Sequence, residues 1–221
     1  MAKIVPNKPL LILLYGFPGS GKTYFARQLS EQVHAAHVQS DRIRHELFEQ
    51  PRYEKQENEV VIHLMDYMTE QFLGAGVSVI YDVNAMRLTQ RRALRDMAKH
   101  AGVVPLLIWF QIDIESAFTR VAARDRRHTD DKFAMPLDRT TFDNLIRHMQ
   151  NPLQEEAYMV ISGKHVFNTQ LSSFIKRLRQ LGLITTPDEM MDTVVKPGLV
   201  NLIPNLAAGR VDLNRRNIVI R

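Results

Sequence analysis

Cysteine is absent from the 221 residues of this chain. Its absence excludes disulfide bonds, thiolate catalysis and cysteine-ligated zinc or iron–sulfur sites, and it fits a reducing compartment. Long apolar runs are also missing, because none approaches the roughly 20 residues that a membrane-spanning helix needs. The short apolar run Leu10–Tyr15 leads into Gly16 without the cleavage site of a signal peptide. We therefore expect a cytoplasmic protein without a membrane partner.

What remains is the composition of an ordinary globular protein. Hydrophobic residues make up 45% of the chain and charged residues 24%, and the length suits one domain with a short appendage. The net charge is +5 and the isoelectric point lies near 9.6. Such a balance suits an enzyme that holds polyphosphate, and it also leaves a nucleic-acid partner open.

Short apolar segments alternate with segments of helical period along most of the chain. The expected strands cover residues 9–15, 37–40, 77–82, 103–111 and 164–168. The expected helices cover residues 22–32, 41–48, 59–73, 88–100, 114–123, 138–150 and 171–181. We interpret the polar residues 51–58 and the charged residues 124–136 as loops. This alternation predicts the α/β class, with a parallel sheet and helices on both faces.

The composition changes after Gly182. Residues 184–221 contain three prolines and two glycines and have no clear period until Asn217. We therefore expect a folded domain over residues 8–183, followed by a C-terminal tail over residues 184–221 that is extended or contacts a partner. Disorder of the tail is the alternative. A homo-oligomer, if one forms, is expected to use this tail.

The segment Gly16–Thr23 fits the pattern G-x-x-x-x-G-K-[ST] at every fixed position. Glycines let the backbone turn so that successive N–H groups point at phosphate oxygens, and the following helix adds its positive end. In this pattern the lysine reaches the outer phosphates and the threonine hydroxyl ligates Mg²⁺. ATP and Mg²⁺ are the expected cofactors, and the pattern serves GTP equally well. The binding candidates are Gly16, Gly19, Ser20, Gly21, Lys22 and Thr23.

Two carboxylates follow expected strands, at the edge where ligands of parallel sheets gather. Asp82 ends the strand 77–82 and could hold Mg²⁺; the alternative is a helix N-cap or turn residue. Asp41 follows the strand 37–40 and could take the proton from an attacking hydroxyl, as a kinase requires. Arg44 could keep that carboxylate ionised and dock the acceptor. The alternative is an N-cap Asp41 paired with Arg44 for stability.

Several arginines gather just before the charged loop, at positions 120, 124, 126 and 127. Phosphoryl transfer needs positive charge around the transferring group, and a lid that closes over the nucleotide can supply it. Arg120 and Arg124 are four residues apart on one helical face, which favours a joint role. The alternative is a solvated basic helix end.

Taken together, these segments resemble the small P-loop kinases of the AAA_33 or zeta-toxin-like type, which are related to phage polynucleotide kinase, gluconate kinase and chloramphenicol phosphotransferase. The resemblance covers about residues 8–182. It is carried by the segments Gly16-Phe-Pro-Gly-Ser-Gly-Lys-Thr23, Ser40-Asp-Arg-Ile-Arg44, Val79-Ile-Tyr-Asp-Val-Asn84 and Arg120–Arg127.

The resemblance implies a P-loop NTPase fold, with a five-stranded sheet in the order 2-3-1-4-5 and a lid. It also implies that Asp41 is the general base, that Arg44 contacts the acceptor and that Asp82 supports the metal site. Arg124 is the first candidate for the lid arginine, and Arg120 is the second. Asn168, in the segment where relatives bind adenine, becomes a candidate for contacts to the base.

We therefore expect an ATP-dependent kinase that moves the γ-phosphate to a hydroxyl of a small molecule or of a nucleic-acid end, with Lys22, Asp41, Arg44 and Arg124 as its catalytic residues. The alternative is an ATP-binding or ATP-hydrolysing regulatory module that binds a partner and has no small-molecule acceptor. The sequence does not define the acceptor.

Overall fold

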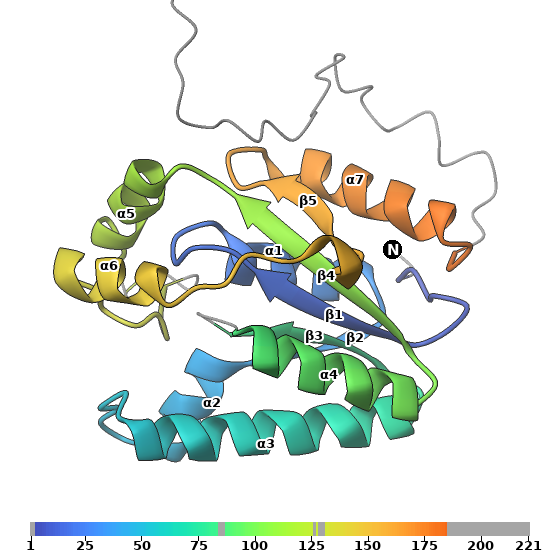
Figure 1. Cartoon of the computed structure of the whole chain (residues 1–221), viewed down its shortest axis with the longest axis horizontal. Coiled ribbons are helices and arrows are strands. Elements are labelled where there is room, and N and C mark those ends of the chain that lie inside the picture. Colours follow the sequence, from blue (N-terminus) through green and yellow to red (C-terminus); the bar gives the residue numbers. More distant parts are fainter. Residues whose placement is uncertain (1–2, 84–86, 126, 128–130, 185–221) are drawn as a thin grey trace, which may run out of the picture.

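We analysed a computed structural model of the chain, which describes residues 3–83, 87–125, 127 and 131–184 (Figure 1). The predicted tail therefore lies outside the described residues, apart from Ile184. Asn84 and Arg126, which belong to two of the segments that carry the family resemblance, lie outside them as well. The division of the chain into a domain and a tail stays a prediction.

The core of the fold is a parallel sheet whose strand order, β2-β3-β1-β4-β5, confirms the predicted order (Figure 1). All six residues of β1 are buried, as expected of a strand covered on both faces. Its neighbours β3 and β4 pair with it in parallel, so that Leu13 faces both Tyr81 and Leu107. The strands are β1 (Leu10–Tyr15), β2 (Ala35–Gln39), β3 (Ser78–Asp82), β4 (Val104–Gln111) and β5 (Met159–Ser162).

Helices cover both faces of the sheet. The helices are α1 (Lys22–Gln32), α2 (Ser40–Leu47), α3 (Lys55–Gly74), α4 (Leu88–His100), α5 (Ile114–Ala122), α6 (Arg139–Arg147) and α7 (Phe167–Gln180), with a 3₁₀ turn, η1 (Gln154–Glu156). Side chains of α1 and α7 pack on one face of β1, and those of α3 and α4 pack on the other. Alternate residues of β1 point to the two faces, because side chains alternate along a strand.

A third, smaller apolar cluster lies at the edge of the sheet. It joins α5 and α6 through Ala117, Val121 and Phe142, and Phe17 of the glycine-rich segment packs against it. The loop between β1 and α1 therefore rests on the same helices that carry the predicted lid. None of the described helices is both long and apolar enough to cross a bilayer.

Several element boundaries differ from the sequence prediction, and two of the differences matter for the site. The predicted strand 164–168 is wrong, because β5 occupies Met159–Ser162 and residues 167–180 already form α7. The predicted loop 51–58 is partly wrong, because α3 begins at Lys55. There the Glu57 carboxylate accepts hydrogen bonds from the backbone N–H groups of Arg52 and Tyr53, at 2.9 and 2.8 Å. These bonds satisfy donors before the helix start and fix the entry of the chain.

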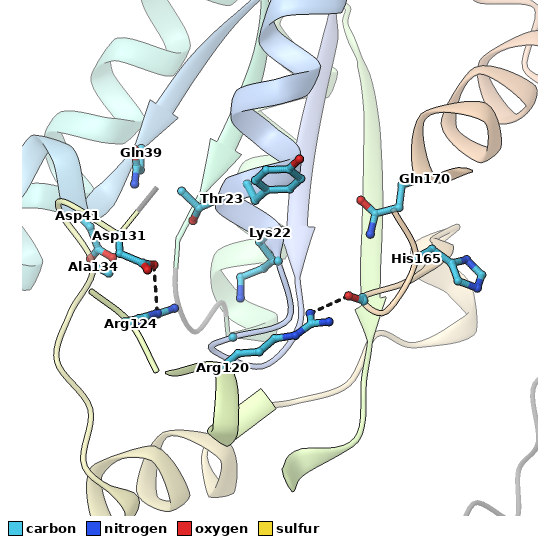
Figure 2. Close-up of a pocket in the computed structure, with 14 residues that line it drawn as sticks. Lys22, Thr23, Gln39, Asp41, Arg120, Arg124, Asp131, Ala134, His165 and Gln170 are labelled. Carbon is cyan, nitrogen blue, oxygen red and sulfur yellow. Dashed lines mark hydrogen bonds and ion pairs between the residues drawn. The ribbon is translucent and has the colours of Figure 1, made fainter. Parts of the chain in front are cut away.

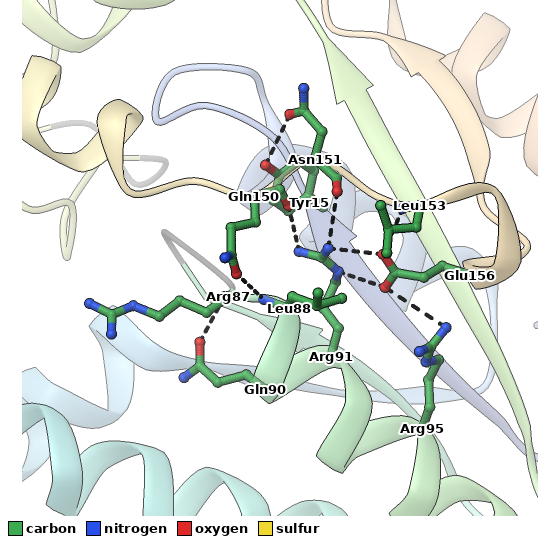
Figure 3. Close-up of polar contacts among 10 residues, drawn as sticks. All are labelled: Tyr15, Arg87, Leu88, Gln90, Arg91, Arg95, Gln150, Asn151, Leu153 and Glu156. Atoms are coloured by element: carbon green, nitrogen blue, oxygen red, sulfur yellow. Dashed lines mark hydrogen bonds and ion pairs between the residues drawn. The ribbon is translucent and has the colours of Figure 1, made fainter.

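A buried ion pair ties α4 to the segment between α6 and β5 (Figure 3). The Arg91 side chain is fully buried and donates to both carboxylate oxygens of Glu156, at 2.8 and 2.9 Å. It also donates to the backbone carbonyl of Gln150 at 2.9 Å, and it lies 4.9 Å from the ring centre of Tyr15. Because Tyr15 is the last residue of β1, this network supports the strand end from which the glycine-rich segment begins.

Candidate functional site

The glycine-rich segment leaves the carboxyl end of β1 and enters α1, as predicted (Figure 2). Two glycines are required there for different reasons. A Cβ on Gly19 would lie 2.2 Å from the carbonyl oxygen of Ala117 in α5, so a side chain has no room. Gly21 has open space around it but a φ of 92°, a backbone conformation that L-residues rarely adopt. The loop thus keeps its shape through close packing at one position and backbone freedom at the other.

Ser20 lies beneath this loop and not on its open side. Its side chain is fully buried, and its backbone N–H donates to the carbonyl of Phe17 at 3.0 Å. Helix α1 begins at Lys22, and the first hydrogen bond toward the loop is donated by Phe25 to Gly21. The first backbone N–H groups of a helix have no partner within it. The backbone donors suited to an anion therefore include those of Lys22 and Thr23, whereas that of Ser20 is already bonded.

Lys22 folds back over its own loop. Its ammonium group donates to the carbonyls of Gly16 and Phe17, at 2.8 and 3.0 Å, and only 5% of the residue is exposed. Burial is the main reason that its pKa falls to about 8; the carboxylates of Asp82 and Asp41 oppose this fall, and the charge of Arg124 adds to it. These contacts use two of the three ammonium donors. A third donor remains for an oxygen of an anion.

A cavity of about 320 Å³ opens beside Lys22, at the carboxyl end of the sheet (Figure 2). Its floor is the glycine-rich loop and the start of α1. One side is formed by the end of β2, the start of α2 and the segment after α5, and the other side by the loop between β5 and α7. The residues that line it are Gly19, Gly21, Lys22, Thr23, Tyr24, Gln39, Asp41, Arg120, Arg124, Asp131, Ala134, Gly163, His165 and Gln170.

Asp41 lies in this cavity, in the first turn of α2. The N-cap of α2 is Gln39, and the helix has no side-chain cap, so the alternative role of Asp41 as N-cap does not apply. Its carboxylate lies close enough to Lys22 and Arg124 to act on the pKa of both groups. Asp41 therefore faces the place where Lys22 would hold an anion.

Arg44 is not among the cavity-lining residues. Its guanidinium donates to Glu57 at 3.0 Å and also to Asn58, and it lies 4.7 Å from the ring centre of Tyr53. Burial opposes ionisation of Glu57, but the backbone N–H groups of Arg52 and Tyr53 and the Arg44 charge outweigh it and lower the pKa of Glu57. Arg44 thus fastens α2 to the start of α3, and a direct contact to an acceptor stays a prediction.

Asp82 is buried at the end of β3, in register with Gln39 of β2. Its Oδ2 lies 3.1 Å from Nε2 of His37, which orients the carboxylate. Thr23 lines the cavity, whereas Asp82 is not one of its lining residues. A hydroxyl and a carboxylate are hard oxygen ligands of the kind Mg²⁺ takes. Among the described residues, no three His, Cys, Asp or Glu side chains gather into a metal cage, so phosphate oxygens and water would complete the coordination of such an ion.

Both predicted lid arginines reach the cavity, but with different partners (Figure 2). Arg120 donates to the carbonyl of Gly163 at 2.7 Å and so spans from α5 to the loop after β5. Arg124 donates to the carbonyl of Met135 at 3.3 Å, and its Nε lies 3.9 Å from Oδ1 of Asp131. Burial is the largest cause of the lowered pKa of Arg124, and the charge of Asp131 opposes it.

The side of the cavity that follows β5 differs from the prediction. Asn168 is exposed in the first turn of α7 and does not line the cavity. His165 and Gln170 line it instead, and Gln170 is fixed by a hydrogen bond to the Ser162 carbonyl at 3.0 Å. Sequence reasoning missed both residues, together with Gln39 and Asp131. The misplaced strand put His165 in the sheet, and nothing in the local sequence marks Asp131 or Gln170.

Comparisons with known proteins agree with this fold. Residues 11–152 match the model of the AAA_33 family, which is described as an AAA domain. No relative is found among curated proteins. Solved structures share the fold at low identity. A gluconokinase from Sinorhizobium meliloti 1021 aligns with a TM-score of 0.58 and 13% identity, over 78% of this chain and 93% of that one.

Two further structures extend the comparison. A sugar kinase from Janibacter sp. HTCC2649 aligns with a TM-score of 0.54 and 15% identity, over 80% of this chain and 95% of that one. Chaetomium thermophilum Kti12 in complex with ADP-AlF₃ aligns with a TM-score of 0.59 and 18% identity, over 80% of this chain and 100% of that one. The chain thus belongs to the AAA_33 family and has the P-loop NTPase fold in its kinase-like form.

Proposed function

We propose that this protein is an ATP-dependent phosphotransferase that moves the γ-phosphate of ATP to a hydroxyl group. The observation that carries the proposal is the arrangement within one cavity of Lys22, Asp41 and Arg124 around the start of α1. Lys22 and the helix start would hold the phosphates. Arg124 would stabilise the charge of the transferring group, and Asp41 would accept the proton of the attacking hydroxyl.

Magnesium fits the same arrangement. Thr23 and Asp82 would hold the ion at the phosphates, Thr23 directly and Asp82 through water. Bound there, Mg²⁺ would neutralise the phosphate charge that develops during transfer. The role of the protein is to orient the Thr23 hydroxyl and the Asp82 carboxylate. His37 contributes through its 3.1 Å contact to the Asp82 carboxylate, as an outer partner that orients a ligand does.

The nucleobase would lie between Tyr24, Arg120 and the loop that carries His165. All of them line the cavity; Arg120 and His165 lie on the side away from Asp41 (Figure 2), and Arg120 is already fixed there by its bond to Gly163. The acceptor would approach from the opposite side, near Gln39 and Asp41. This division puts the two substrates on opposite sides of the phosphates, as an in-line displacement requires.

The acceptor class is tested with a panel of candidate acceptors that covers the kinases named above and nucleic-acid ends. Gluconate, a neutral sugar and a 5′-hydroxyl oligonucleotide are each incubated with the protein and Mg·ATP, and both ADP and phosphorylated product are measured. Product formed with one of them supports the proposal and names the class. ATP that binds and is slowly hydrolysed with every acceptor would favour the alternative of a regulatory module. If calorimetry detected no binding of Mg·ATP or Mg·GTP, both the phosphotransferase and the regulatory module would be ruled out.

The lowered pKa of Lys22 predicts how nucleotide affinity depends on pH. A phosphate needs the protonated amine, and that form becomes the minor one in the nucleotide-free protein above a pH of about 8. We therefore expect Mg·ATP affinity to fall about 30-fold from pH 7 to pH 9.5, from the fraction of protonated amine at a pKa of 8. Calorimetry in buffers of different ionisation enthalpy should also show proton uptake on binding at the higher pH.

Lys22→Arg is the matched control, since a guanidinium stays protonated over this range. Its absolute affinity is not the readout, because the larger group must fit a buried site. Its affinity should instead be nearly level between pH 7 and pH 9.5. A wild-type profile that is equally level would show that Lys22 does not titrate near pH 8.

A further inference from the structure

One carboxylate in the cavity has no part in the proposed transfer. The described lining carries the cations Lys22, Arg120 and Arg124 and the carboxylates Asp41 and Asp131. Asp41 is the proposed base, whereas Asp131 only adds negative charge where a polyphosphate would bind. A carboxylate and a phosphate that share a partly buried space repel one another. Its presence beside the phosphate-binding residues therefore needs a reason.

That reason lies in the partner of Asp131. Its Oδ1 lies 3.9 Å from Nε of Arg124 (Figure 2), and the two side chains are 30% and 22% exposed. The distance is beyond that of a charge-assisted hydrogen bond, about 2.7–2.9 Å, so this is a loose ion pair. The guanidinium donates besides to the Met135 carbonyl at 3.3 Å, again a long bond. Arg124 is thus charge-balanced but weakly bonded.

A weakly bonded arginine in a cavity can exchange its partner. Asp131 offsets the cost of burying the Arg124 charge, and it is itself held by the backbone N–H of Asp125 at 3.3 Å. A terminal phosphate offers Arg124 two oxygens in the planar arrangement that a guanidinium prefers. Such a bidentate contact would replace the loose one, provided that the phosphate reaches Arg124.

We propose that Asp131 is a competing counter-ion, which the terminal phosphate of a nucleoside triphosphate must displace from Arg124. This inference rests on the proposed function and deepens it, because it makes Asp131 a residue that sets the ratio of triphosphate affinity to diphosphate affinity. A diphosphate lacks the group that reaches Arg124, so Asp131 keeps its partner. After transfer, the carboxylate takes the guanidinium back, which restores the pair seen in the structure.

The test is Asp131→Asn, titrated by calorimetry with the slowly hydrolysed analogue Mg·AMP-PNP and with Mg·ADP. Removing the Asp131 charge should lower the Kd of the triphosphate analogue about 5-fold, which corresponds to the free energy of one loose ion pair. The diphosphate affinity should change by less than about 2-fold, since that ligand does not reach Arg124. Asp125→Asn is the control, because Asp125 lies in the same segment but is not a cavity-lining residue.

The second variant needed is Arg124→Gln. In the Arg124→Gln background, Asp131→Asn should no longer strengthen binding of the analogue, because the guanidinium for which Asp131 and the phosphate compete is absent. Melting temperatures of all variants establish that they fold. Unchanged or weaker binding of the analogue by Asp131→Asn, or an equal gain with and without Arg124, would overturn the inference while leaving the proposed function intact. Failure of the wild type to bind either nucleotide would instead overturn both.

Discussion

Asp41→Asn is expected to stop phosphate transfer without weakening nucleotide binding. The amide keeps the shape of the carboxylate but cannot accept the proton of an attacking hydroxyl, and loss of a general base costs about 10²–10⁴-fold in rate. Asp41 places a negative charge near both Lys22 and Arg124, so its removal lessens the repulsion of the phosphates. The Kd for Mg·ATP should therefore stay the same or fall, while product formation with the acceptor found in the panel is lost.

Glu46→Gln makes the same change of charge on the same helix, at an exposed position that does not line the cavity. It should retain the wild-type rate, which separates proton transfer from a general effect of charge on α2. Single-turnover measurements with saturating acceptor isolate the chemical step from product release. If Asp41→Asn transferred phosphate at the wild-type rate, the base would have to be sought elsewhere in the cavity.

Features of the fold and of the site that depend on residues close together in the sequence were predicted well. The glycine-rich segment can be recognised because its backbone geometry is local: Gly19 and Gly21 both have positive φ, at 82° and 92°. Asp41 was found because it directly follows a strand, and parallel strands end at a common edge. The sheet order was implied by the family resemblance, and continuous burial of β1 agrees with the apolar run that predicted it.

Prediction was weaker where a side chain contacts a partner that is distant in the sequence. Arg44 was expected near the acceptor, but its guanidinium pairs with Glu57, 13 positions away, because α3 begins a turn earlier than the polar sequence indicated. The predicted strand 164–168 misplaced the wall that carries His165 and Gln170. Asp131 gained its role only through its contact with Arg124. Each of these outcomes depends on how separate elements meet, which local pattern does not encode.

The largest expected effect on stability concerns the buried pair of Arg91 and Glu156 (Figure 3). Arg91→Met leaves a carboxylate with a fully buried side chain without its principal partner, which typically costs about 3–5 kcal/mol of unfolding free energy. Urea denaturation at pH 7 measures this loss. Arg95→Met is the control, since Arg95 lies one turn further along α4 and only 3.8 Å from the same carboxylate, with 21% of its side chain exposed. It should cost less than about 1 kcal/mol.

The pH dependence identifies the cause of that loss. In the wild type, burial works to raise the pKa of Glu156, but Arg91 and the backbone N–H of Leu153 outweigh it, so the pKa lies below 4.5. The pair then stabilises the fold above pH 4.5 and loses this contribution as the pH falls through the native pKa. Without Arg91, burial should raise the pKa of Glu156 above its unfolded value, so the variant loses stability as the pH rises. Its deficit should therefore be smaller at pH 4.5 than at pH 7, and the double variant Arg91→Met, Glu156→Leu should regain most of the loss. A deficit that is the same at both pH values would point to lost packing against Tyr15 and not to an unpaired charge.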